Sequence, residues 1–193
     1  PPIVIVHKAA VRPPIRIFAK DNLMVVYTEF LPATSAIPLL IQAILDYAQR
    51  KAIDTLVCMT GIPIPNRFEV EKLRSFYISS NQRVAESAKD LGVEPFDNGF
   101  LVGPYAILLK EVIRRRMNAL VLLTESFMEF PDPEASAKNL ELLSKITGLP
   151  IDIRELLEQA ELIRIRAREH MKRLMPNLAQ MRKEYEYTPP LHL

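Results

Sequence analysis

The 193-residue sequence predicts an α/β protein, a three-layer αβα sandwich around one mostly parallel or mixed sheet. Short β-branched runs alternate with stretches whose apolar residues recur at helical spacing. Two runs, TLVCM (residues 55–59) and ALVLLT (residues 119–124), are apolar without interruption, which is typical of strands covered on both faces. We expect a long C-terminal helix and an extended tail to follow the sandwich.

Composition and charge exclude several classes of protein. Hydrophobic residues make up 49% of the chain and charged residues 25%, which is typical of a folded rather than a disordered protein. A net charge of +2 gives little attraction for nucleic acid or anionic lipid, so neither is expected as a partner. The single cysteine, Cys58, cannot form an internal disulfide, and we therefore expect a cytoplasmic protein.

The first part of the chain predicts short strands. The runs IVIV (residues 3–6), IRIF (15–18) and LMVVYT (23–28) are rich in β-branched residues. Pro13 and Pro14 lack backbone donors, so this region is expected at a sheet edge or in a loop.

Helices are predicted between and after the two apolar runs. Thr34 or Ser35 is expected to cap a helix that continues to about Arg50, and further helices are expected over residues 80–90 and 104–116. These helices and the apolar runs give the alternation on which the fold class rests.

The stretch from residue 124 to 152 predicts a loop and a well-capped helix. Asp132 is expected at the N-cap, Pro133 at the first helical position, and Glu134 near the positive end of the helix dipole. Gly148 is expected to end the helix in a left-handed conformation.

The last helix carries a narrow apolar stripe on an otherwise charged surface. Residues at spacings of four and three form this stripe: Leu156, Ala160, Ile163, Ala167, Met171 and Leu174. The stripe is expected to form an interface between copies of the chain in a homo-oligomer. The surrounding Glu and Arg residues fit equally well a solvated face with ion pairs between successive turns.

The sequence carries none of the common motifs for catalysis or for holding a cofactor. The three histidines, His7, His170 and His192, are far apart, and the chain has no H-x-x-x-H or C-x-x-C pair, so no metal is expected. A P-loop, a G-x-G-x-x-G turn and a G-x-S-x-G elbow are also missing, so no cofactor is expected.

The best enzyme-like cluster surrounds Ser126. Glu125, Glu129 and Asp132 lie near this serine in sequence, but a serine nucleophile usually needs a histidine base, and none is close. We therefore expect no catalytic residues and no enzyme activity.

Apolar residues in the same loop suggest a different role. Phe127, Met128 and Phe130 are expected either to pack within the loop or to form a contact surface for a partner. The contact surface is the preferred interpretation over an active site.

Three segments resemble the proteasome-assembling-chaperone family, especially its archaeal members. They are GIPIPNR (residues 61–67), GFLVGPYAILLKEVIRRRMNALVLLTES (99–126) and FPDPEASAKNLELLSKITGLPIDIRELLEQAE (130–161). The resemblance covers most of the chain from Ile3 to about Arg166. It implies a non-catalytic αβα fold distantly like nucleoside phosphorylases, homo-oligomers, and binding to the α-subunits of the 20S proteasome ring.

The end of the chain partly resembles the docking tripeptide of proteasome activators. That tripeptide consists of a hydrophobic residue, a tyrosine and any third residue. Leu191 fits the hydrophobic position and Leu193 can supply the carboxylate, but His192 replaces the tyrosine. An imidazole hydrogen-bonds but buries less apolar area than a phenol ring, so weaker docking is expected. A tail that binds no partner is the alternative.

The expected division is a core over residues 1–150, a helical segment over 151–187 and a tail over 188–193. Members of the family usually begin with further strands and a helix, and this segment is expected to be missing from the core. Two other functions are kept open. One is a small-molecule hydrolase or phosphorylase-like enzyme with a pocket near Glu125, Ser126 or Asn66, and the other is a purely structural homo-oligomer.

Overall fold

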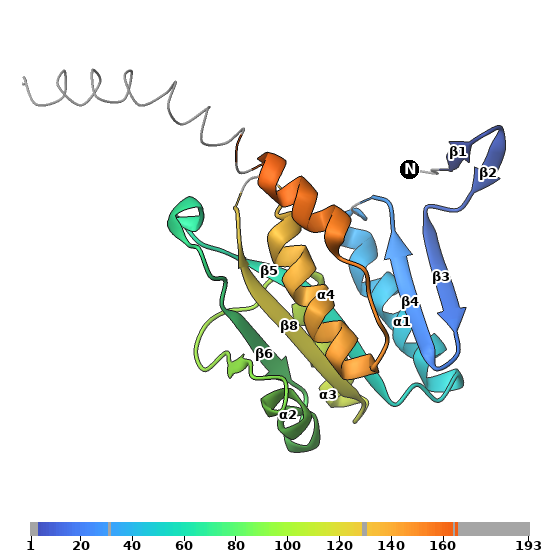
Figure 1. The fold of residues 1–193 in the computed structure, drawn as a ribbon. Coiled ribbons are helices and arrows are strands. Elements are labelled where there is room, and N and C mark those ends of the chain that lie inside the picture. Colours follow the sequence, from blue (N-terminus) through green and yellow to red (C-terminus); the bar gives the residue numbers. More distant parts are fainter. Residues whose placement is uncertain (1–3, 31, 129–130, 164, 166–193) are drawn as a thin grey trace, which may run out of the picture. The chain divides into compact units, whose positions relative to one another are not determined.

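The computed structural model describes residues 4–30, 32–128, 131–163 and 165 (Figure 1). Contacts divide the chain into two compact units. The first unit takes its residues from 1–58 and 77–121, and the second takes its residues from 59–76 and 122–193.

Two antiparallel hairpins open the first unit. Strands β1 (Ile5–His7) and β2 (Ala10–Arg12) pair around a tight turn at Lys8 and Ala9, which both have positive φ. Strand β3 (Ile15–Lys20) pairs with β4 (Leu23–Thr28) along its full length. The prediction of strands at 15–18 and 23–28 is therefore confirmed, whereas β2 was not predicted.

The helices of the first unit follow the apolar periodicity of the sequence. They are α1 (Ile37–Arg50), α2 (Gln82–Lys89) and α3 (Pro104–Arg114), with a short 3-10 turn η1 (Thr34–Ala36) before α1. Helices α1 and α3 pack together, and each contributes fully buried side chains, Leu45 and Val112 among them.

The predicted cap of α1 is wrong. Neither Thr34 nor Ser35 caps the helix, because both lie within η1 and the N-cap is Ala36, which has no side-chain cap bond. The backbone N–H of Ala36 instead donates to the carbonyl of Ala33 at 2.8 Å. A backbone turn thus satisfies the donor that the hydroxyl was expected to satisfy.

A four-stranded sheet contributes residues to both units. Its strands are hydrogen-bonded in the order β5-β8-β6-β7, with bounds Thr55–Pro63 for β5, Ser75–Ser79 for β6, Glu94–Pro95 for β7 and Asn118–Ser126 for β8. Strands β6 and β7 were not predicted.

Hydrogen bonds at the strand ends show that this sheet is mixed. The side-chain amide of Asn118 donates to the carbonyl of Asp54, and the backbone N–H of Ile64 donates to the carbonyl of Ser126. The starts of β5 and β8 therefore lie together, as do their ends, so the two strands are parallel. Glu125 donates to Arg74, whereas Ser80 donates to Ala119, so β6 and β8 are antiparallel. The predicted α/β class with a mixed sheet and flanking helices is confirmed.

The two apolar runs differ in burial. Strand β8 is buried from Ala119 to Ser126, as expected for a strand covered on both faces. Strand β5 is the outer strand in the order, and of its residues only Cys58 is buried. As an outer strand in the described part of the chain, β5 has one open flank and is less buried than β8, and the expectation of cover on both of its faces stays a prediction.

In the second unit, the structure confirms the predicted helix after β8. Helix α4 (Pro133–Thr147) has Asp132 at its N-cap and Gly148 in the left-handed conformation at its C-cap. The short 3-10 turn η2 (Arg67–Glu69) and a further helical stretch over residues 154–163 belong to the same unit. Within the described part of the chain, no helix is long and apolar enough to cross a membrane.

Candidate partner-binding site

The loop between β8 and α4 presents an apolar side chain to solvent. Met128 is 67% exposed, whereas Phe127 is half-buried. The Phe127 ring packs against the Phe68 ring, with centroids 4.5 Å apart, and its backbone N–H donates to Asp132 Oδ2 at 3.2 Å. Phe127 thus fixes the start of the loop, and the side chain of Met128 next to it is exposed to solvent.

Asp132 is the polar centre of this anchor. Its carboxylate is buried and accepts from the backbone N–H of Ala135 at 3.1 Å, as an N-cap does. The same carboxylate accepts from the N–H of Phe127 and from two nitrogens of Arg67. The sequence predicted the cap but not the three additional donors.

Arg67 supplies the compensating charge from η2. Although only 2% of the residue is exposed, its guanidinium binds Asp132 through Nε at 2.7 Å and Nη2 at 3.2 Å. Nη2 also donates to Glu134 Oε2 at 2.8 Å. Burial lowers the pKa of Arg67, but hydrogen bonds and charge from both carboxylates outweigh this effect, and the pKa is raised above its usual value.

The guanidinium of Arg67 also lies over the Phe127 ring, 4.9 Å from its centroid. The anchor therefore joins residues from η2, the loop and the start of α4. We name this group, Arg67, Phe68, Phe127, Asp132 and Glu134, the loop anchor. Because its polar atoms are satisfied within the chain, the loop anchor holds the backbone at Phe127 and at Asp132.

A second buried network fixes the start of the same loop. The hydroxyl of Thr124 donates to Asn139 Oδ1 at 2.9 Å and accepts a 2.8 Å hydrogen bond from Ser75. Asn139 in turn donates to the carbonyl of Thr60 at 3.1 Å. This network links β5, β6 and β8 to α4 within the second unit.

The members of the enzyme-like cluster already have structural partners. The buried carboxylate of Glu125 accepts from the backbone N–H and Nε of Arg74, both at 2.9 Å. The buried hydroxyl of Ser126 donates to the carbonyl of Phe127 at 3.3 Å. A Cβ at Gly61 would lie 2.2 Å from Ser126 Oγ, so the β5 backbone covers this hydroxyl closely. Glu129 lies outside the described residues.

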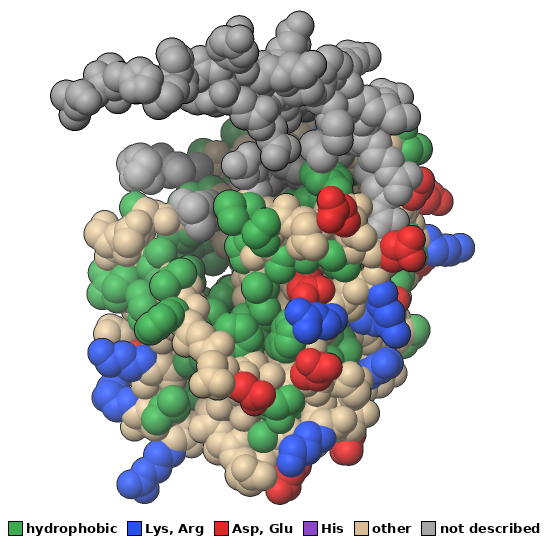
Figure 2. All heavy atoms as spheres, turned by 90° about the vertical axis from the view of Figure 1, so that its left-hand side faces the viewer, with side chains coloured by type: hydrophobic (Ala, Val, Ile, Leu, Met, Phe, Trp, Pro, Cys, Tyr) green, Lys and Arg blue, Asp and Glu red, His purple; other side chains and the backbone are tan. Residues whose placement is uncertain are grey.

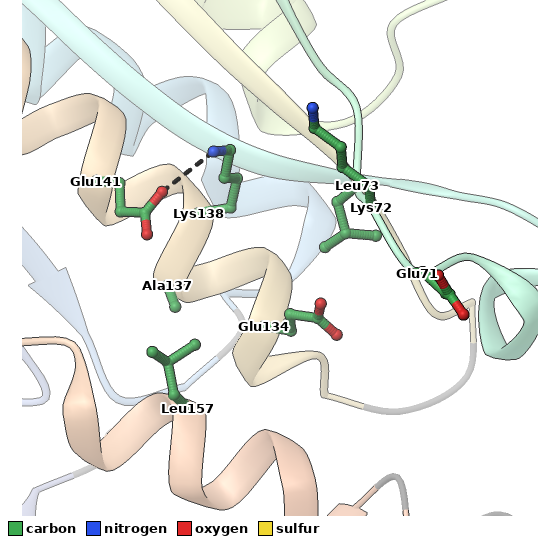
Figure 3. Close-up of a pocket in the computed structure, with 8 residues that line it drawn as sticks. All are labelled: Glu71, Lys72, Leu73, Glu134, Ala137, Lys138, Glu141 and Leu157. Atoms are coloured by element: carbon green, nitrogen blue, oxygen red, sulfur yellow. Dashed lines mark hydrogen bonds and ion pairs between the residues drawn. The ribbon is translucent and has the colours of Figure 1, made fainter.

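A shallow pocket of about 200 Å³ opens in the second unit and shares Glu134 with the loop anchor (Figure 3). Leu73, Ala137 and Leu157 supply its apolar lining, and Ala137 and Leu157 face each other across it. Charged residues complete the lining, and among them Lys138 pairs with Glu141 at 3.1 Å. The enzyme alternative expected a pocket near Glu125, Ser126 or Asn66, and none of these residues lines this one.

Groups of three or more His, Cys, Asp or Glu side chains that could hold a metal ion are not found among the described residues. On the face shown in Figure 2, hydrophobic side chains reach the surface between scattered charged ones.

The structure places only some of the predicted site residues. Leu156, Ala160 and Ile163 are half-buried on the last helical stretch. Phe130, Ala167, Met171, Leu174 and the tripeptide Leu191, His192 and Leu193 lie outside the described residues. Three more exposed apolar residues of the last helical stretch and its continuation were not predicted: Leu157, Leu162 and Ile165.

Arg67 and Arg74 were not predicted as members of the site either. Their carboxylate partners lie 65 and 51 residues away in sequence, and no local pattern marks such a pairing. One sequence signal could have indicated a buried ion pair at this place. Acidic residues stand at the end of a wholly apolar strand, where a buried carboxylate needs a cation.

The fold and the site define a mixed α/β protein with an exposed apolar residue, Met128, just after its central strand. The sequence model described as the PAC2 family matches residues 1–171, and the chain belongs to this family. The resemblance to the proteasome-assembling-chaperone family is thereby confirmed.

Solved structures support the same assignment. The chain is similar to Pyrococcus furiosus PbaA, an archaeal homolog of proteasome-assembly chaperone, with a TM-score of 0.78 and 25% identity over 97% of this chain and 79% of that chain. It shares the fold of Pyrococcus furiosus PbaB, an archaeal proteasome activator, with a TM-score of 0.71 and 23% identity over 86% and 76% of the two chains.

A curated relative is an uncharacterized protein of Methanocaldococcus jannaschii. It is 27% identical over 184 residues, which cover 95% of this chain and 75% of the relative. This relative extends the family likeness but carries no functional information.

Proposed function

We propose that this chain is a homologue of proteasome assembly chaperones that acts in the cytoplasm as a non-catalytic, ATP-independent proteasome-binding factor. It binds the α-subunits of the 20S ring through the loop that carries Phe127, Met128 and Phe130. The tail residues Leu191, His192 and Leu193 contribute part of the binding. They belong to the segment 188–193, which acts separately from the core when it binds the α-subunits. The stripe that begins at Leu156 joins copies in a homo-oligomer.

The observation that carries the proposal is the similarity to PbaA over 97% of this chain at 25% identity. The local geometry supports a binding role for the loop. The loop anchor holds Phe127 and Asp132, and the Thr124 network holds the end of β8, so the backbone that leads to Met128 is fixed before a partner binds. The single, buried cysteine is consistent with a reducing compartment.

Native mass spectrometry with purified archaeal α-subunits tests the proposal. The intact chain is compared with a version that ends at Pro190 and with a Met128→Ser variant. Leu39→Ser in α1 is the matched control, because Leu39 is 69% exposed, nearly the same as Met128. We expect the intact chain and the control to bind, and both other variants to bind more weakly.

Each outcome has a clear meaning. If the version ending at Pro190 binds unchanged, the tail has no part in binding, and if Met128→Ser binds unchanged, the loop has none. If the intact chain does not bind α-subunits, the proposed function is wrong and a purely structural homo-oligomer becomes the better explanation. A rise in thermal midpoint with nucleosides would instead support the phosphorylase-like alternative.

A further inference from the structure

The loop between β7 and α3, in the first unit, contains the only Asn-Gly pair of the sequence. Residues 96–103 read FDNGFLVG and lie outside helices and strands. Asn98 and Gly99 are both exposed. Asparagine is among the chemically least durable residues, because the backbone nitrogen that follows it can attack its side-chain carbonyl.

Packing within the loop requires glycine after Asn98. A Cβ at Gly99 would lie 2.6 Å from two ring carbons of Phe96, so this ring lies directly against the glycine backbone. The Phe96 ring is half-buried, and its backbone N–H donates to the carbonyl of Tyr77 at 2.9 Å. The same packing that selects glycine also leaves the attacking nitrogen without a neighbouring Cβ to hinder it.

The side chain of Asn98 differs from other asparagine side chains of the protein. Asn118 donates its amide to the carbonyl of Asp54 at 2.9 Å, and Asn139 donates to the carbonyl of Thr60 at 3.1 Å. Within the part of the chain that the structure describes, no such hydrogen bond holds the amide of Asn98. Its reaction therefore breaks no bond that stabilises the fold.

We propose that Asn98 and Gly99 form a self-modifying site that converts the amide into a carboxylate. The backbone nitrogen of Gly99 attacks Cγ of Asn98, the bond from Cγ to Nδ2 breaks, and the proton of the Gly99 amide leaves with the ammonia. The product is a cyclic imide. Water then adds to one of its two carbonyls and breaks a C–N bond, which gives aspartate or isoaspartate at position 98.

The modification changes both the charge and the backbone of the loop. The new carboxylate would stand next to Asp97 and two residues before Phe100, which is 98% exposed. The net charge would fall from +2 to +1, because a neutral amide becomes an anion. Isoaspartate also adds a carbon to the backbone before Gly99, which would move the glycine relative to the Phe96 ring.

The reaction needs only atoms of two adjacent residues and water. It therefore does not depend on binding to the proteasome or on contact with a second copy, and the proposed function and this site fail independently of each other.

The chain contains a matched internal control at Asn22. This residue lies in the turn between β3 and β4, is exposed, and follows Asp21 as Asn98 follows Asp97. The following residue differs, since Leu23 presents a Cβ to the attacking nitrogen and Gly99 does not. We expect Asn98 to react about tenfold or more faster than Asn22 for this reason.

Mass spectrometry of the aged full chain measures both positions in one sample. The folded protein is kept at neutral pH below its thermal midpoint and then digested with trypsin. Asn22 falls in peptide 21–50, and Asn98 is the only asparagine of peptide 90–110. We expect peptide 90–110 to gain the mass difference between O and NH, and peptide 21–50 to stay unchanged.

A second readout identifies the product. Protein-isoaspartate methyltransferase transfers a labelled methyl group from S-adenosylmethionine to isoaspartate, and we expect the label in peptide 90–110. Asn98→Gln should remove both signals, because glutamine would have to close a larger ring. Retention of the methyl label in Asn98→Gln would place the isoaspartate at another residue and overturn the assignment.

The unfolded chain supplies the chemical reference. The same protein is aged in urea, where every asparagine is free of the fold. If Asn98 reacts there but not in the folded protein, the fold holds the loop against ring closure and the proposal is wrong. Equal rates at Asn22 and Asn98 in the folded protein would also overturn it, because Gly99 would then have no effect.

Discussion

In the second unit Arg67 is 2% exposed although it carries a full charge, whereas in the first unit Phe18 is 52% exposed although its ring is apolar. Arg67 is buried because Asp132 and Glu134 compensate its charge within the chain. Phe18 is exposed because β3 and β4 form a sheet of only two strands in the described part of the chain. Burial of a charged side chain thus follows from its partners within the chain, whereas exposure of an apolar one follows from the small number of strands around it.

The largest effect is expected from breaking the loop anchor. Arg67→Met should lower the free energy of unfolding by about 3–5 kcal/mol, because the buried carboxylate of Asp132 loses its cation. Urea unfolding at pH 7 measures the change. The double variant Arg67→Met/Asp132→Asn should recover part of the loss, since the uncompensated charge is then removed.

The control for this prediction is Arg83→Met. Arg83 also pairs with a carboxylate, that of Asp54, but both side chains are exposed. Arg83→Met should leave the free energy of unfolding unchanged within experimental error, because exposed ion pairs contribute little to stability. Equal losses in Arg67→Met and Arg83→Met would contradict the distinction between a buried and an exposed ion pair.

A smaller loss is expected where β5 covers the start of the loop. Gly61→Ala should cost about 1–3 kcal/mol, because the new Cβ would lie 2.2 Å from Ser126 Oγ. Thermal unfolding followed by circular dichroism measures the cost. The second change Ser126→Gly removes the obstructing side chain and should restore stability, and a double variant as weak as Gly61→Ala would argue against this contact.

Helix capping in the first unit gives a still smaller effect. Asn81 accepts from the N–H of Val84 at 3.1 Å at the start of α2. Asn81→Ala should cost about 1 kcal/mol in urea unfolding, and Asn81→Asp, which keeps the acceptor, should cost less. The opposite order would show that the bond from Asn81 to Asn118, rather than the cap, is the main contribution.

The smallest effect is expected on the exposed hairpin. Val25→Thr should change the free energy of unfolding of the monomer by no more than about 0.5 kcal/mol, because the side chain is exposed and threonine keeps the β-branched shape. Urea unfolding at low protein concentration measures it. A loss of several kcal/mol there would mean that another part of the same chain already covers the hairpin.

The sequence predicted best those features that depend on neighbouring residues. Asp132 at the N-cap and Gly148 at the C-cap of α4 follow from local backbone chemistry, and both are confirmed. The strand over residues 23–28 matches β4, since its turn and its β-branched residues are also local. The Thr34 or Ser35 cap failed because a short 3-10 turn competed for the same donors.

Features that depend on distant residues could not be predicted. No residue near Arg67 in the sequence indicates that its side chain is buried, because its partner Asp132 comes 65 residues later. Strand β6 has too few residues and too little apolar alternation to be distinguished from a loop. The different burial of β5 and β8 reflects the strand order, which neither run contains in itself.

The position of β8 between β5 and β6 also determines when the protein can fold during synthesis. Strand β4 ends at Thr28, whereas β8 begins roughly 90 residues later, at Asn118. A hairpin forms in about 1–10 μs, but a ribosome adding about 5–20 residues per second needs roughly 5–20 s for that interval. A nascent chain thus carries the β3–β4 hairpin for several seconds before the four-stranded sheet can be completed.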